Sequence, residues 1–196
     1  MSDLPQFLLA GFALAGSPGP NTLSMAAVGA AFGRRDAIGY LLGLSFGMLG
    51  VIALVGTGTA GLLLAVPGAA PVITGLAALY FLWLAWRIAN APPIGPADSG
   101  RRPPRWHEGA LLSMMNPKAY AAMAALFSGF TLRPEPLPDA LTKTLVAFAV
   151  ILTVNAAWMV IGTLLTRLAG NPRTARAINY GFAAALLISV AATTLL

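Results

Sequence analysis

The chain has 196 residues, of which 58% are hydrophobic and 9% are charged, and its net charge is +6. This composition is typical of a membrane protein and argues against a soluble domain. Because cysteine is absent, disulfides and thiolate metal sites are excluded. The basic residues lie in short loops and not on one amphipathic face, so no nucleic-acid partner is expected.

Charged and turn residues divide the sequence into six apolar segments, at 4–32, 37–66, 70–87, 108–132, 137–165 and 175–196. About 20 apolar residues are enough for a helix to cross the hydrocarbon layer of a bilayer. The alternating pattern of barrel strands is missing. No basic stretch or cleavage pattern accompanies the first segment, so we expect it to be retained as a span. The sequence therefore predicts an all-α membrane protein with six transmembrane helices in one domain, residues 1–196.

The loops between these segments alternate in their content of Lys and Arg. Basic residues concentrate in or beside the first, third and fifth loops, and they are Arg34, Arg35, Arg87, Arg101, Arg102, Arg105, Arg167, Arg173 and Arg176. The fourth loop holds Arg133 and Lys143, and the second holds no basic residue. The positive-inside rule then predicts cytoplasmic odd-numbered loops and periplasmic termini.

The third loop is the one stretch with the composition of a linker. Residues 91–107 contain five prolines and have no apolar period, as expected for a connection between two units. The linker, predicted to be cytoplasmic, joins half-repeats 1–90 and 108–196, each with three spans. An odd number of spans makes the halves enter the bilayer in opposite orientations, which predicts a 3+3 inverted repeat.

The first apolar segment is interrupted at "SPGPN". Pro18 and Pro20 each remove a backbone donor and clash with the preceding turn, and Gly19 between them tolerates unusual backbone conformations. We therefore expect the first helix to break near the middle of the bilayer. The freed carbonyls would include those of Leu14 and Gly16.

The fourth segment carries a matching interruption at "NPKAY". Pro117 frees the carbonyl of Ser113 about nine residues into the segment. Half-helices that begin at Pro20 and Pro117 would direct N–H groups and positive dipole ends at the midplane, beside the freed carbonyls. This arrangement predicts a site for a zwitterion. The alternative is a pair of structural kinks, repaired by neighbouring groups.

Four polar side chains at depth are the remaining site candidates. Lys118 is the only basic residue that the sequence places well inside a span, where a charge is costly. A bound carboxylate would compensate it, or Lys118 would lose its proton and carry protons, or it is capped by carbonyls for packing. Asn21, Asn116 and Asn155 either bind substrate or bridge helices.

Two further sequence patterns are weak evidence for a function. "GLSFG" matches the G-x-S-x-G pattern of a serine hydrolase, but Ser45 lies in a helical run and the single histidine, His107, lies at the membrane interface. We predict no enzyme, no cofactor and no metal site, because few metal ligands are present. Small-residue faces in the second helix, Gly43, Gly47 and Gly50 and then Gly56, Gly58 and Gly61, would support internal packing or a homodimer.

The chain resembles the lysine exporter (LysE/RhtB) family of amino-acid efflux proteins. The resemblance rests on "SPGPN", "NPKAY", "GRRDAIGYLLGLSFG" and "LAALYFLWLAWR", in that order along nearly the whole chain. It implies a proton-coupled exporter in the bacterial inner membrane, with Pro18, Gly19, Pro20, Asn21, Asn116, Pro117 and Lys118 along the pathway.

Some members of that family have an acidic residue in the fifth span, where this chain has Asn155. We therefore expect a neutral amino acid or related metabolite as substrate. The alternative from another class is a non-transporting membrane scaffold or assembly factor.

Overall fold

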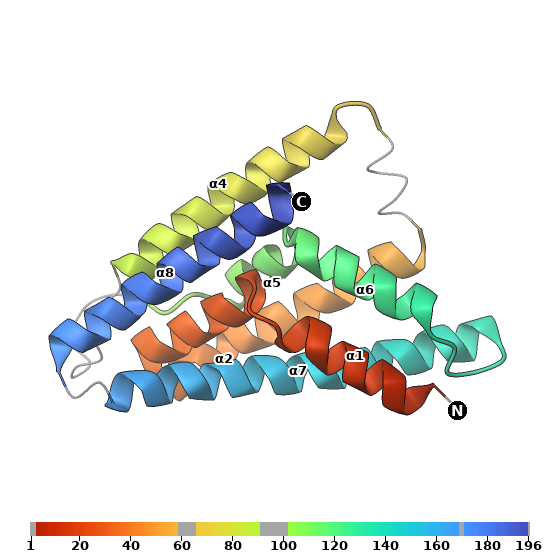
Figure 1. The fold of residues 1–196 in the computed structure, drawn as a ribbon, viewed down its shortest axis with the longest axis horizontal. Coiled ribbons are helices and arrows are strands. Elements are labelled where there is room, and N and C mark those ends of the chain that lie inside the picture. Colours follow the sequence, from red (N-terminus) through yellow and green to blue (C-terminus); the bar gives the residue numbers. More distant parts are fainter. Residues whose placement is uncertain (1–2, 59–65, 91–101, 169–170, 196) are drawn as a thin grey trace.

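The computed structural model describes residues 3–58, 66–90, 102–168 and 171–195. These residues form helices joined by short connections, without strands in the described ranges (Figure 1). The helices are α1 (Leu4–Gly16), α2 (Pro20–Gly56), α4 (Ala69–Ala89), α5 (Trp106–Met114), α6 (Pro117–Gly129), α7 (Pro136–Leu168) and α8 (Pro172–Leu195). The all-α prediction is confirmed, while residues 59–65, at the end of the second predicted segment, and most of the linker 91–107 lie outside the described residues.

Helix α2 contains two antiparallel arms. Gly33 has φ 76° and ψ 172°, which is not helical, and only glycine adopts such a conformation readily. Figure 1 shows the orange chain reversing direction here. The first and second predicted segments are therefore separated by a turn at one glycine. Arg34 and Arg35, predicted in a loop, are exposed at the start of the second arm.

Glycines let α2 approach its neighbours at backbone distance. A Cβ on Gly43 would overlap the carbonyl oxygen of Trp106 in α5, and one on Gly47 would lie 2.5 Å from the carbonyl oxygen of Ala110. The predicted packing face is thus correct for this part of α2. Gly56 has no described atom within 4 Å of an added Cβ, and Gly58 follows the end of the helix with φ 72°, so neither packs against another described helix of this chain. Gly61 lies outside the described residues.

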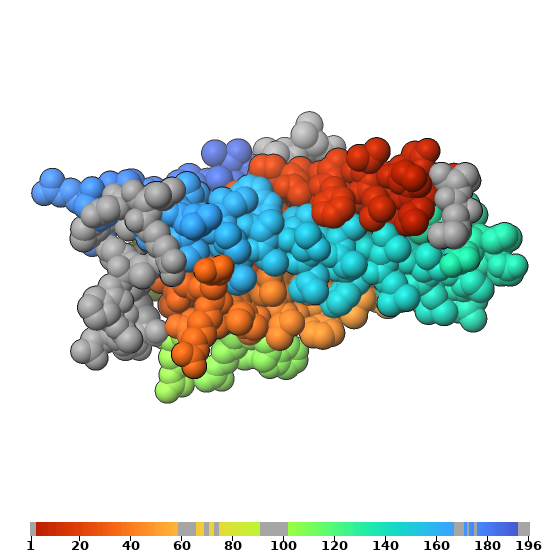
Figure 2. All heavy atoms as spheres, turned by 90° about the horizontal axis from the view of Figure 1, so that it is seen from below, coloured from red at the N-terminus to blue at the C-terminus, as the bar shows by residue number. Residues whose placement is uncertain are grey.

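The outer surface of the bundle is apolar. Leu9, Leu79, Leu145 and Ile188 are 65% to 73% exposed, which is unusual for a protein surrounded by water. Figure 2 shows the side of the bundle on which α7 runs lengthwise between α1 and α2. Two helices, Pro20–Gly56 and Pro136–Thr166, are long and apolar enough to cross a membrane, judged by length and composition alone. The surface and the helices agree with an integral membrane protein.

Lys143, whose charge is counted with the fourth loop in the sequence, lies near the start of α7. Its side chain is 6% exposed. Its Nζ is 2.6 Å from Asp139 and donates to the carbonyl of Phe127 at 2.9 Å. Asp139 also accepts from the backbone N–H groups of Leu132 and Arg133. The sequence shows the charge of Lys143 but not its ion pair with Asp139. The charge alone therefore suggests a loop.

Asp139→Asn should destabilise the protein by about 2 kcal/mol, because Lys143 keeps its charge in a buried place and loses its counter-charge. The thermal midpoint should fall by about 4 to 8 °C, as measured by unfolding in detergent. Glu135→Gln makes the same chemical change at an exposed side chain and should leave the midpoint within about 1 °C. Equal midpoints for the two variants would show that the ion pair does not stabilise the fold.

Candidate substrate site

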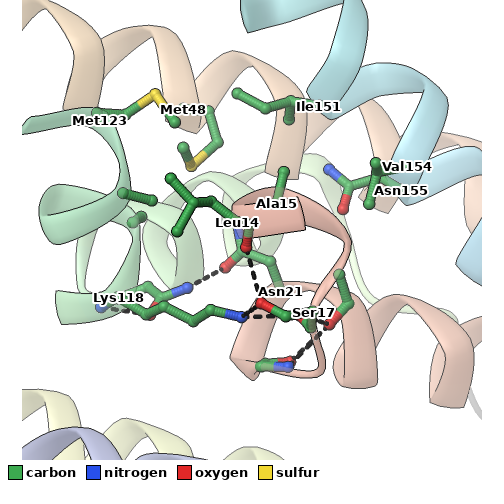
Figure 3. Close-up of a pocket in the computed structure, with 15 residues that line it drawn as sticks. Leu14, Ala15, Ser17, Asn21, Met48, Lys118, Met123, Ile151, Val154 and Asn155 are labelled. Carbon is green, nitrogen blue, oxygen red and sulfur yellow. Dashed lines mark hydrogen bonds between the residues drawn. The ribbon is translucent and has the colours of Figure 1, made fainter. Parts of the chain in front are cut away.

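The structure confirms both helix interruptions and brings them together. Helix α1 ends at Gly16 and α2 begins at Pro20, while α5 ends at Met114 and α6 begins at Pro117. Proline supplies no N–H and presets φ, so Pro20 and Pro117 each occupy the first helical position after a break. Hydrogen bonds then join one break to the other across the core (Figure 3).

The asparagines after the breaks bridge the helices. Asn21 Nδ2 donates to Ser113 Oγ and Asn116 Nδ2 donates to Asn21 Oδ1, each at 2.9 Å. Ser113 Oγ in turn donates to the carbonyl of Leu44 at 2.8 Å. Buried polar groups of this kind hold a unique arrangement when each has a partner. Of the two roles left open for Asn21 and Asn116, the bridging role is therefore observed.

Lys118 reaches from α6 to the end of α1. Its Nζ donates to the carbonyl of Ser17 and to Ser17 Oγ, each at 2.7 Å, and to the carbonyl of Pro18 at 3.1 Å. Among the described residues, no carboxylate is paired with Lys118. The lysine is thus held by neutral acceptors at the C-terminal end of α1, where the helix dipole also favours a cation. Its positive charge therefore has no counter-charge among the described residues.

A small cavity lies beside Lys118. Its volume is about 40 Å³, room for about three water molecules. In Figure 3 its polar side carries Ser17, Asn21 and Lys118, and Met48, Met123 and Ile151 lie opposite.

Asn155 from α7 also lines this cavity. Its side chain is buried, and its Nδ2 has no hydrogen-bond partner, so it is a donor that an entering ligand or water would satisfy.

The three carbonyls predicted to accept from a substrate's ammonium group each have a hydrogen-bond donor within the chain. The carbonyl of Leu14 accepts from Ser17 Oγ, that of Gly16 from the indole of Trp158, and that of Ser113 from the backbone N–H of Asn116. Nearby groups therefore repair these three carbonyls, as a kinked helix in lipid requires.

The backbone N–H at the start of α6 is also occupied. The N–H of Lys118 donates to Asn116 Oδ1 at 3.1 Å. That amide, predicted to face a substrate, is capped by the chain's own side chain.

No sequence pattern pointed to Ser17, to Met48 or to the hydroxyl group of Ser113. Ser17 contributes both a hydroxyl and a carbonyl to Lys118, but any residue has a carbonyl, so residue type carries no signal for it. Its place directly before Pro18 is the one available hint. Ser113 and Met48 belong to the site through tertiary contact alone.

Gly19→Ala should displace Lys118 without unfolding the protein. Gly19 has φ −171°, an extended conformation open to any residue, so the constraint is space: an added Cβ would lie 2.9 Å from Lys118 Cδ and Nζ. Losing one charged hydrogen bond, about 1.5 kcal/mol, should raise acylation of Lys118 by an amine-reactive reagent about tenfold, as read by mass spectrometry. Gly16→Ala, at a position with nothing within 4 Å, is the control. Equal acylation in both variants would contradict the packing of Lys118 over Gly19.

Comparison with known proteins gives relatives along the whole chain. A family model described as LysE type translocator matches residues 12–196. A homoserine/homoserine lactone efflux protein of Salmonella typhimurium is 25% identical over 187 residues, 93% of this chain and 91% of the relative. An uncharacterized membrane protein of Vibrio cholerae is 28% identical over 155 residues, 76% of this chain and 74% of the relative.

A cysteine/O-acetylserine efflux protein of Salmonella choleraesuis has higher identity over a shorter region. It is 36% identical over 87 residues, which is 44% of this chain, and the matched region spans 43% of the relative. No solved structure gives a significant match.

Proposed function

Because the chain belongs to the LysE type translocator family, we propose that it is a secondary carrier that exports a neutral amino acid or related small metabolite. The observation that carries this proposal is Lys118, an ammonium held by three neutral acceptors on the polar side of a cavity at the two helix breaks. A carrier needs such a site in its interior, where a substrate is bound away from either surface.

The proposed architecture is six spans in a 3+3 inverted repeat. The first span comprises α1 and the first arm of α2, and the fourth comprises α5 and α6, so each half begins with a broken helix. The proposed location is the bacterial inner membrane, with periplasmic termini, which follows from the loop charges. The linker 91–107 would then lie in the cytoplasm.

The proposed substrate contacts use charge and hydrogen bonding. Lys118 binds the carboxylate of the substrate, and Asn155 Nδ2, unpartnered beside the cavity, donates to a second oxygen. The apolar side of the cavity, which includes Met48 and Met123, accommodates an uncharged side chain. Relatives named for efflux of homoserine, cysteine and O-acetylserine support a small substrate of this kind.

Protons are the proposed coupling ion, because export against a gradient needs an energy source and protons that flow into the cell in exchange for the substrate would supply it. A non-transporting scaffold is the less favoured alternative. It has no use for an unpartnered amide and an unpaired ammonium in its core, since both lower the stability of the fold.

The test is flux through the purified wild-type protein. Proteoliposomes loaded with labelled homoserine, cysteine, O-acetylserine or lysine should release one of the neutral compounds faster than protein-free liposomes, and lysine no faster. An imposed proton gradient, acidic on the receiving side, should accelerate release. Release equal to that of protein-free liposomes for every compound would contradict the carrier function, and release that the imposed proton gradient does not accelerate would contradict proton coupling.

A further inference from the structure

The end of α1 forms a site complementary to a primary ammonium group. Two carbonyl oxygens, of Ser17 and Pro18, and the hydroxyl of Ser17 converge on one nitrogen at 2.7 to 3.1 Å. An ammonium has three N–H donors and no acceptor, so three acceptors satisfy it completely. The negative end of the α1 dipole adds to its attraction. We call these three oxygen atoms the ammonium cage.

In this structure the chain's own lysine fills the cage. The Lys118 side chain passes over Gly19, where its Cδ and Nζ lie 2.9 Å from the position of an added Cβ. Because Lys118 Nζ takes all three acceptors, the ammonium group of a substrate can enter the cage only when Lys118 moves out of it.

We propose that the cage is the subsite for the substrate's ammonium group and that Lys118 leaves it to pair with the substrate's carboxylate. This inference rests on the proposed transport function. The exchange replaces one ammonium by another, so the hydrogen bonds of the cage are kept. The ammonium of Lys118 gains an anionic partner, which it lacks among the described residues, and charge-assisted hydrogen bonds are stronger than those to neutral acceptors.

The exchange accounts for selectivity. A compound with an amino group and no carboxylate gives Lys118 no new partner, so it does not displace the lysine. A compound with a carboxylate and a trimethylated nitrogen has no N–H to donate to the carbonyls of Ser17 and Pro18. A ligand therefore needs a carboxylate and an ammonium group with N–H donors on the same small molecule. When no substrate is bound, Lys118 returns to the cage and keeps other cations out of it.

The first experiment empties the cage by mutation. Purified Lys118→Ala in detergent is titrated with n-propylammonium, and thermal stability is measured. The concentration of n-propylammonium that gives half of the full rise in thermal midpoint should be at least tenfold lower for the variant than for the wild type, where the lysine occupies the cage. Tetramethylammonium, which has charge and no donor, and n-propanol, which has no charge, should not stabilise the variant. Adding Ser17→Ala removes one acceptor and should weaken the amine effect severalfold.

The second experiment uses the wild-type protein, so it stands even where Lys118→Ala does not fold. Homoserine should stabilise the protein and its N-trimethyl derivative should be at least tenfold weaker. Equal stabilisation by the two compounds overturns the subsite. So does an n-propylammonium response that is the same in Lys118→Ala and the wild type.

The two proposals fail separately. No flux of any amino acid through the wild type removes the carrier function, whatever the amine does to Lys118→Ala. Flux of homoserine through the wild type, with no difference between homoserine and its N-trimethyl derivative, leaves the carrier standing and removes the cage as its ammonium subsite.

Discussion

Lys118→Ala should lower export of the transported amino acid by about 10- to 100-fold. The substitution removes the one cation that faces the cavity among the residues that line it, and the substrate's carboxylate then enters the interior without a counter-charge. Hydrogen bonds to charged groups are worth about 1.5 to 3 kcal/mol, which converts to this range of rates or affinities. The measurement is release of labelled homoserine from proteoliposomes that contain equal amounts of folded protein.

Arg133→Ala is the matched control for Lys118→Ala. It removes the same charge at an exposed position and should leave export within about twofold of the wild type. Lys118→Arg should also be impaired, because a planar guanidinium does not fit three acceptors arranged around a single nitrogen. Export by Lys118→Ala at the wild-type rate would show that the lysine is structural, as in the reading that carbonyls cap it for packing.

Gly43→Ala should destabilise the protein by about 3 kcal/mol, the upper end of the range for overpacking. The added Cβ would overlap the carbonyl oxygen of Trp106, and a helix backbone cannot turn aside as a flexible side chain does. Helices α2 and α5 must then move apart. The thermal midpoint should fall by about 6 to 12 °C.

Gly39→Ala lies one turn earlier on the same arm of α2, with nothing within 4 Å of the added Cβ. It should leave the midpoint unchanged or raise it slightly, because alanine favours the helix over glycine. A similar fall for both variants would indicate that the cost arises within the helix and not from contact with Trp106.

The position of the helix breaks could be predicted from the sequence because the cause is local. Pro18, Pro20 and Pro117 lack an N–H wherever the chain folds, and the structure interrupts the helices beside each of them. The all-helical class followed equally from apolar segments too long for strands. The turn at Gly33 was bracketed by the predicted segments, although its single-residue length was not.

The partners within the site could not be predicted in the same way. Lys118 was recognised as an unusual charge, but its acceptors include two backbone carbonyls, and a carbonyl has no signature in the sequence. Lys143 was assigned to a loop because its charge was visible and its pairing with Asp139 was not. Gly43 and Gly56 are both glycines of α2. An added Cβ would meet the backbone of Trp106 at Gly43 and no described atom within 4 Å at Gly56.

The sequence by itself determined where the helices break and that a lysine lies beside one break, because the geometry of proline and the order of residues along the chain do not depend on the rest of the fold. The tertiary structure decided that the two breaks meet, that Asn21 and Asn116 join them, and that Ser17 and Pro18 hold the lysine. Those facts depend on which helices pack together, and packing depends on the complementary shapes of surfaces far apart in the chain.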